Sequence, residues 1–222
     1  MKLLAIDTSS SYLSLALSLD GQLHFFHEEM GQQHAERTLP EIGRLLQQAD
    51  IGLSALDAIV FGQGPGSFTG LRIACGLAQG LAFSASLPVI GIPTLDAVAH
   101  QSGADQVLVC LDARMQQVYC AAYQTGPAWQ RLSPITLQDP QDVQLPAGIT
   151  VLAGDGFASY PALLMQQRDS TSHSGVLRAD ARAHIELAQT GRYPLQHPRE
   201  AELLYVRNKV ALTSLEQQAL KG

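Results

Sequence analysis

The sequence is poor in charge, and the charge it has is mostly negative. Charged residues make up 15% of the chain against 46% hydrophobic residues, which is typical of an ordered globular protein with a large interior or interface and no disordered tail. The formal net charge of −6 disfavours an independent nucleic-acid binder, which normally presents a basic face to phosphates. Any role on RNA would therefore need a basic partner.

Cysteine and histidine occur without the spacing that forms disulfide frameworks or binds metals. The three cysteines, Cys75, Cys110 and Cys120, lie in apolar segments and form no C-x-x-C pair, so we expect buried, reduced thiols. The seven histidines form no H-E-x-x-H motif and no i, i+4 pair on an expected helix. This argues against a zinc site built from local spacing.

Long apolar runs are also missing. No run reaches the ~18 residues that span a bilayer. The first residues reach the carboxylate of Asp7 too soon for the apolar core of a signal peptide. We therefore expect a cytoplasmic protein without a membrane segment.

The sequence does contain a Gly-rich turn that leads at once into a helix of small residues. An apolar strand is expected over 57–61 and the helix over 71–84. The turn between them contains Gly62, Gly64, Pro65, Gly66 and Gly70. Its backbone can lie close to another backbone or to a ligand, and strand, Gly-rich loop and helix is the order of a phosphate cradle. The turn lacks the Lys-Ser/Thr ending of a P-loop and the G-x-G-x-x-G spacing, so this signal is unspecific.

The helix after the turn carries two smooth ridges. One consists of Gly76, Gly80 and Ser84, and the other of Ala74, Ala78 and Ala82. Residues four apart in a helix share a face, on which a second helix can lie close. Each Gly costs roughly 1 kcal/mol against Ala in a helix interior. We therefore expect something to pack here, either this protein's own core or another subunit.

The chain before this stretch predicts an antiparallel meander and a helix. Strands are expected over 2–7, 12–19 and 22–28. The bend at 7–11, Asp-Thr-Ser-Ser-Ser, either holds a phosphate or a metal-bound water or is an ordinary turn. A helical pattern follows over 34–49 with Pro40 inside it. Either the helix begins near Thr38, or a longer helix is kinked at Pro40.

From residue 107 the same plan of elements starts again. Further elements are expected as a strand at 88–92, a helix at 95–100, strands at 107–112, 118–123, 129–135 and 151–153, and helices at 159–167 and 179–190. Asp112 ends its strand as Asp7 does, and Gly154-Asp155-Gly156 follows its strand as Gly62-Gln63-Gly64 does. This internal duplication of elements predicts two lobes, with the tail at 201–221 returning to the first.

The doubled plan resembles the actin, hexokinase and Hsp70 ATPase superfamily. Within it, three segments look like the TsaB (YeaZ) family: Leu4-Ala5-Ile6-Asp7-Thr8-Ser9, the run GPGSFTGLR at 64–72, and Tyr205-Val206-Arg207. The resemblance covers nearly the whole chain, and the run at 64–72 is its most specific part. It implies an α/β fold of two ribonuclease-H-like lobes, with mixed sheets flanked by helices and a reduced second lobe. The first lobe is expected over 1–104, completed by 201–222, and the second over 105–200.

The resemblance also implies a role in forming threonylcarbamoyladenosine at position 37 of tRNAs that read codons beginning with A. In that pathway the paralogue TsaD transfers the threonylcarbamoyl group, TsaB proteins pair with it, and the ATPase TsaE joins the pair. We therefore expect a non-catalytic subunit that forms a heterodimer with TsaD, a homodimer when alone, and contacts tRNA only through the complex.

Metal chemistry is not expected in this chain. In TsaD an H-x-E-x-H-type pair of histidines holds the metal, and alignment on Gly91-Ile92-Pro93 puts Thr94 and Val98 at those two places. Neither side chain supplies an imidazole nitrogen. Asp96 alone is not a metal site, and His100 is two residues out of register. The resemblance thus implies an inactive paralogue with no catalytic residues.

In the family the paralogues associate through the small-residue helix and the preceding amphipathic helix of their first lobes. The expected partner or dimer interface is Leu39, Ile42, Leu46, Leu71, Arg72, Cys75, Gly76, Gln79, Gly80 and Phe83. The phosphate loops of the superfamily survive in outline as Asp7, Thr8, Ser9, Gly64, Gly66, Ser67, Gly154, Asp155 and Gly156. The second lobe has few residues for an adenine pocket. We expect no cofactor of its own, with ATP or ADP bound weakly or at the heterodimer interface.

Two other classes of function stay open. One is an enzyme: an actin-like ATPase or small-molecule kinase, or a metalloprotease, as the family's older label of glycoprotease says. The other is a direct tRNA chaperone that uses a local basic patch of Arg178, Arg182, Arg192 and Arg199. Turnover of ATP or of a peptide by the chain alone would favour an enzyme.

Overall fold

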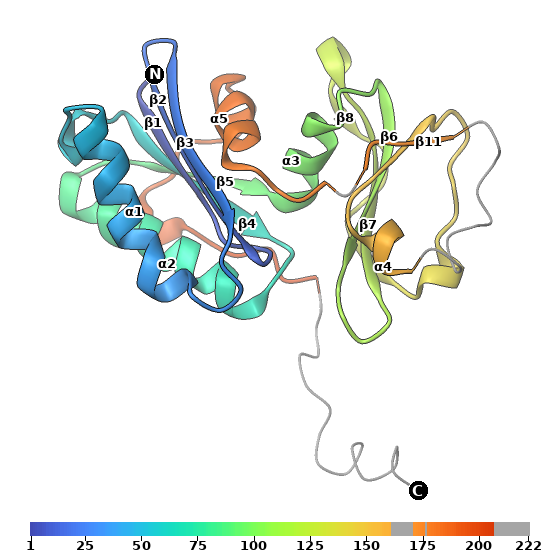
Figure 1. Cartoon of the computed structure of the whole chain (residues 1–222). Coiled ribbons are helices and arrows are strands. Elements are labelled where there is room, and N and C mark those ends of the chain that lie inside the picture. Colours follow the sequence, from blue (N-terminus) through green and yellow to red (C-terminus); the bar gives the residue numbers. More distant parts are fainter. Residues whose placement is uncertain (161–170, 176, 207–222) are drawn as a thin grey trace, which may run out of the picture.

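The protein is a mixed α/β molecule of two lobes. The computed structural model describes residues 1–160, 171–175 and 177–206. It contains one five-stranded sheet and one six-stranded sheet, which stand side by side with helices α3 (Thr94–Gln101) and α5 (Ala181–Gln189) between them (Figure 1). Helices α1 (His34–Gln48) and α2 (Phe68–Ala85) cover the outer face of the first sheet.

The first sheet has the strand order β3-β2-β1-β4-β5. Its strands are β1 (Leu3–Asp7), β2 (Tyr12–Leu19), β3 (Gln22–Glu29), β4 (Ala58–Gly64) and β5 (Val89–Pro93). The first three form the expected antiparallel meander, while β1, β4 and β5 run parallel. All of β1 is buried, because helices cover both faces of the sheet, and this is why its sequence is continuously apolar up to Asp7.

The second sheet repeats this topology. Its order is β11-β10-β6-β7-β8, with β9 also paired to β7. The strands are β6 (Gln106–Asp112), β7 (Val118–Gln124), β8 (Gln130–Arg131), β9 (Thr136–Gln138), β10 (Val151–Ala153) and β11 (Ser172–His173). Strands β6 and β7 are antiparallel, whereas β10 is parallel to β6 and to β11. The order therefore matches the first sheet strand for strand, and the predicted duplication is confirmed.

Three of the expected elements need correction. The single strand expected over 129–135 is wrong: β8 and β9 pair separately with β7, and Pro134 between them has no N–H to donate to a ladder. Helix α4 (Gly156–Ser159) begins before the expected 159, and most of the range 159–167 lies outside the described residues. Helix α2 begins at Phe68, not Leu71, because the Ser67 side chain accepts a hydrogen bond from the N–H of Gly70 and caps it.

The two open questions about helices are answered. Helix α1 runs continuously from His34 with Pro40 inside it, so the longer of the two alternatives is observed. On α2 the Ala ridge of Ala74, Ala78 and Ala82 is fully buried, whereas Gly76 and Gly80 are exposed. The Ala ridge therefore packs on the chain's own core, and the Gly ridge does not.

The chain returns to the first lobe earlier than residue 201. Helix α5 packs on β1 and β2, and the N–H of Ala181 donates to Ser14 Oγ at 2.8 Å. Gln196 then forms a bridge with Val89 at the edge of the first sheet. The expected second-lobe range of 105–200 thus includes residues that pack on the first lobe. No helix among the described residues is both long and apolar enough to cross a membrane.

Candidate functional site

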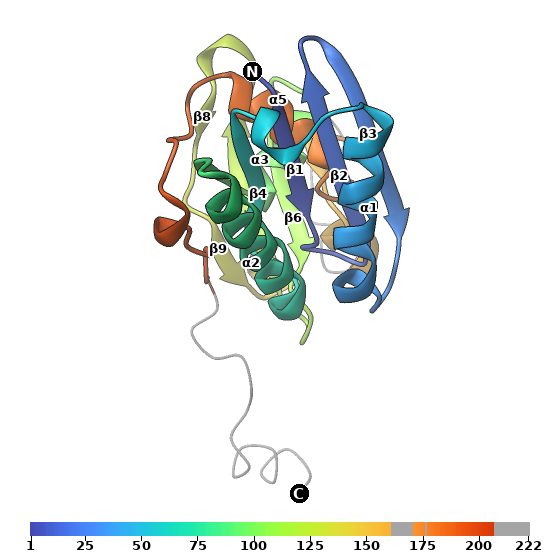
Figure 2. The ribbon, with the colours of Figure 1, turned by 90° about the vertical axis from the view of Figure 1, so that its left-hand side faces the viewer.

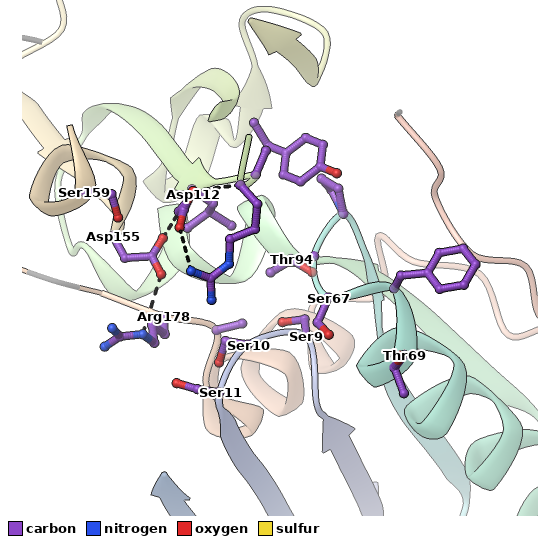
Figure 3. Close-up of a pocket in the computed structure, with 18 of the residues that line it drawn as sticks. Ser9, Ser10, Ser11, Ser67, Thr69, Thr94, Asp112, Asp155, Ser159 and Arg178 are labelled. Carbon is purple, nitrogen blue, oxygen red and sulfur yellow. Dashed lines mark hydrogen bonds and ion pairs between the residues drawn. The ribbon is translucent and has the colours of Figure 1, made fainter. Parts of the chain in front are cut away.

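A cavity of about 690 Å³ lies between the two lobes. Its first-lobe wall consists of the bend at 9–11, the Gly-rich turn at 65–69 and Thr94, and its second-lobe wall includes the β6–β7 hairpin at 111–115, Asp155 and Arg178 (Figure 3). The structure thus brings together both sets of loops that the sequence singles out as phosphate loops.

The two first-lobe loops hydrogen-bond to each other. The N–H of Ser67 donates to the carbonyl of Ser9 at 2.7 Å, and Thr8 Oγ1 donates to the carbonyl of Gly70 at 2.7 Å. A Cβ at Gly66 would lie 2.6 Å from the Ser9 carbonyl oxygen. Glycine is therefore needed here so that one backbone can lie against another, and the N–H of Ser67 is already used within the protein.

Asp7 is buried and is not one of the residues that line the cavity. Its Oδ1 accepts from the N–H and Oγ of Ser9, at 2.9 and 2.7 Å. Its Oδ2 lies 3.4 Å from Nε2 of His184 on α5, and both side chains are almost fully buried. His184 Nδ1 lies 3.0 Å from the Asp180 carbonyl, which only accepts, so this nitrogen is the donor. Oδ1 of Asp7 is therefore engaged by its own loop, whereas Oδ2 and Nε2 of His184 face each other without a hydrogen bond.

The second-lobe loop is arranged in the same way. A Cβ at Gly156 would lie 2.8 Å from the Cys110 carbonyl oxygen, and Gly154, with a φ of +107°, packs on the same carbonyl. Asp155 Oδ1 accepts from the N–H of Asp112 at 3.0 Å, and Arg178 lies 3.5 Å from Asp155 Oδ2. Burial raises the pKa of Asp155 above its usual range, although the hydrogen bond and Arg178 oppose this.

A polar cluster around Asp96 lies between Thr94 and Val98, the two positions that the sequence analysis aligns with the paralogue's histidines. Val98 is in the core, and Thr94 lines the cavity with its Oγ1 buried and without a hydrogen-bond partner. Asp96 between them accepts two hydrogen bonds from Arg131, at 2.8 and 2.9 Å, and one from Tyr123 at 2.8 Å. The Asp96 carboxylate thus links α3 to the second lobe.

Burial and the charge of Asp96 together raise the pKa values of the tyrosines that contact it. Tyr193 donates to Asp96 Oδ2 at 2.9 Å. Burial, and then the negative charge of Asp96, raises the pKa of both Tyr123 and Tyr193. Both phenols therefore stay protonated and remain donors. Among the described residues, no group of three or more His, Cys, Asp or Glu could hold a metal ion.

We expect calorimetric titration of the isolated protein with ATP or ADP to give no submicromolar binding. The reason is that Asp7 Oδ1 and the Ser67 N–H, two groups that would meet a phosphate or its metal ion, already form hydrogen bonds with Ser9 inside the protein. The measured quantity is the heat released on each injection. A submicromolar Kd would show that these loops open to take a ligand.

Helices α1 and α2 lie side by side as the outermost layer of the first lobe (Figure 2). Their outer surface presents Leu39, Arg72, Gly76, Gly80 and Phe83, and we call this set the α1–α2 face. Leu39 is 50% exposed and Phe83 60% exposed. A Cβ at either glycine would meet nothing within 4 Å. Apart from Arg72 this set is apolar, and the surface over Gly76 and Gly80 is smooth and uncovered by the described part of the chain, while Arg199 lies over the Phe83 ring.

Three residues expected in the interface are not on this face. Ile42, Leu71 and Cys75 are buried, with at most 6% of each exposed, so they belong to the core beneath it. Leu46 is half-buried against the same core. Gln79 donates to the carbonyl of Pro198 at 3.1 Å, so it holds the C-terminal segment.

The C-terminal segment adds aromatic surface that the sequence analysis does not assign. Tyr205 and Phe68 are about half exposed, and the centres of their rings lie 6.4 Å apart. The Arg72 guanidinium carbon lies 3.3 Å from the centre of the Phe68 ring and 5.3 Å from that of Tyr205. Leu204 fixes the segment by donating its N–H to the Gln63 carbonyl at 2.8 Å. The only signal for this is the Tyr205-Val206-Arg207 motif.

Comparison with known proteins agrees with this architecture. The family model described as TsaD, tRNA N6-adenosine threonylcarbamoyltransferase, matches residues 26–209. The chain is 34% identical to the tRNA threonylcarbamoyladenosine biosynthesis protein TsaB of Escherichia coli K12, covering 97% of this chain and 98% of that protein. It is also 34% identical to TsaB of Haemophilus influenzae, covering 97% of each.

A solved structure shows the same fold. The structure of YeaZ from Pseudomonas aeruginosa superposes with a TM-score of 0.82 at 34% identity, over 92% of this chain and 99% of that one. The fold and its paired loops thus define a two-lobed α/β protein of the actin, hexokinase and Hsp70 class. Within that class, the chain belongs to the TsaB (YeaZ) family.

Proposed function

We propose that this chain is a non-catalytic partner subunit that acts with TsaD and TsaE when threonylcarbamoyl is transferred to adenosine 37 of tRNAs reading codons that begin with A. The observation that carries the proposal is the uncovered Gly ridge of α2, which lies opposite the buried Ala ridge of the same helix. The names of the similar TsaB proteins support the pathway. Such a role belongs in the cytoplasm.

The α1–α2 face fits a related helix pair as its partner. A helix that crosses Gly76 and Gly80 can approach closely, while Leu39 and Phe83 bury apolar area at the sides. An interface of about 800 Å² per partner would be of ordinary size. TsaD is our proposed occupant, because a protein with the same first-lobe fold can present a matching face. In its absence, a second copy of this chain forms an isologous homodimer there.

The paired loops support a subunit without its own chemistry. Asp7 is held by Ser9, and Asp96 by Arg131 and two tyrosines. ATP or ADP then binds to this chain weakly, or binds at the heterodimer interface, where the partner completes the site. Contact with tRNA comes through the complex: Arg178 and Arg182 already lie beside Asp155 and Asp180, so they are not free for phosphates.

Size-exclusion chromatography with light scattering tests the assembly. The chain is run alone, mixed with TsaD from the same cell, and mixed with TsaD and TsaE, each with and without ATP. We expect a homodimer that exchanges into a heterodimer with TsaD and then takes up TsaE. A monomer that ignores TsaD would overturn the proposal and return attention to an enzyme in the cleft.

A further inference from the structure

Cys110 and Cys120 face each other across the β6–β7 ladder. They are direct partners in the strand register, and their Sγ atoms lie 2.8 Å apart. Both are buried free thiols. Neither belongs to the α1–α2 face or lines the cavity between the lobes, so the proposed function gives them no role.

The ladder places this pair where a cross-strand disulfide fits. The N–H of Ala113 donates to the Gln117 carbonyl, and that of Thr125 to the Asp105 carbonyl. Hydrogen-bonded and non-hydrogen-bonded pairs alternate along an antiparallel ladder, so counting inward from either end makes Cys110 and Cys120 a non-hydrogen-bonded pair. Such pairs have Cα atoms roughly 4.5 Å apart, within the ~4.4–6.8 Å of disulfides.

A separate cavity gives access to one of the two thiols. It has a volume of about 340 Å³ and is lined by Leu108, Cys120, Thr136 and Pro146 among others. Cys110 is not among its lining residues and is fully buried. Burial also raises the pKa of the Cys110 thiol well above its usual range, which keeps it protonated. A small oxidant in this cavity would therefore meet Cys120 first.

We propose that Cys110 and Cys120 are a modification site at which a hydroperoxide forms a cross-strand disulfide. In the first step the Cys120 sulfur attacks hydrogen peroxide, an S–O bond forms, the O–O bond breaks, and water leaves with the thiol proton. In the second step the Cys110 sulfur attacks the Cys120 sulfenic acid, the S–S bond forms, the S–O bond breaks, and a second water leaves with the Cys110 proton. The two thiols lose two electrons, which reduce the peroxide.

This disulfide would link β6 covalently to β7, the two strands of the hairpin that lines the cavity between the lobes. Residues 111–115 of the hairpin are part of the cleft wall, and they lie between the two cysteines in the chain. The modification would therefore restrict the second-lobe side of the cleft, on the opposite lobe from the α1–α2 face.

The test uses the full, reduced protein and hydrogen peroxide. After the peroxide is removed with catalase, the protein is denatured in an alkylating reagent and cleaved before Asp residues. This cleavage puts Cys75 in fragment 57–95, Cys110 in 105–111 and Cys120 in 112–138. We expect the last two fragments to be joined by a reducible bond, while Cys75 remains alkylated, so that two of the three thiols are lost. The Cys75→Ser variant should give the same joined fragments.

Several outcomes would overturn the proposal. These are alkylation of Cys110 and Cys120 after peroxide has been consumed, a disulfide that includes Cys75, or a bond between two molecules. The order of the steps is tested with Cys110→Ser, in which dimedone should label Cys120 because its sulfenic acid has no thiol to attack it. Label on Cys75 alone would contradict that order. The fragments of the unchanged protein show whether the disulfide forms, whether or not the Cys110→Ser variant folds.

Discussion

The Gly76→Leu variant is expected to fold normally and to lose its partner. A Cβ at this position meets nothing within 4 Å, so the isolated chain has room for the new side chain. A helix lying across the ridge would be pushed away, and overpacking of this kind costs about 1–3 kcal/mol, which corresponds to roughly 5- to 150-fold weaker association. Light scattering of the mixture with TsaD measures the association, and thermal unfolding followed by circular dichroism measures the fold.

Ala78→Leu is the matched control on the same helix. Ala78 is fully buried on the opposite ridge. There the larger side chain should lower the free energy of unfolding by about 1–3 kcal/mol. If Gly76→Leu instead lost its secondary structure, or bound TsaD as tightly as the unchanged chain, the α1–α2 face would not be the interface.

The Asp7→Asn variant is expected to be destabilised. The substitution leaves the shape of the side chain almost unchanged but removes the charge from a buried acceptor of two hydrogen bonds from Ser9. Hydrogen bonds to a charged group are stronger than those to a neutral one, so the free energy of unfolding should fall by about 1–3 kcal/mol. Urea unfolding at neutral pH measures this loss.

Asp20→Asn provides the comparison for Asp7. Asp20 is 75% exposed and lies 3.8 Å from Lys2, so removing its charge should change the stability by less than about 0.5 kcal/mol. A stable Asp7→Asn protein that has lost only its activity would contradict a structural role. It would favour Asp7 as a group that acts in the cleft.

The order of the elements could be predicted because it depends on local pattern. Apolar strands, Gly-rich turns and the second Asp-ended strand at 107–112 were sufficient to predict the doubled sheet. The predicted boundaries of helices and strands were wrong where a single side chain determines the boundary. The Ser67 cap extends α2 towards the N-terminus, and Pro134 separates β8 from β9.

The candidate site was harder to predict, because it depends on contacts between distant residues. Helical spacing identified two ridges on α2 but could not say which one faces the core. The family resemblance placed Ile42 and Leu71 in the expected interface, although both are buried in the isolated chain. Nothing local pairs Asp7 with His184, and the Gly-rich turn has the same sequence whether its N–H groups meet a phosphate or the Ser9 carbonyl.

The most direct test of the central claim is reconstitution of the modification on tRNA. Unmodified tRNA is incubated with ATP, threonine-derived adenylate, TsaD and TsaE, with and without this chain, and the nucleosides are measured by mass spectrometry. We predict that threonylcarbamoyladenosine forms only when the chain is present with its partners, and that the chain alone forms none. Equal product without the chain, or product from the chain alone, would contradict a non-catalytic subunit that the reaction requires.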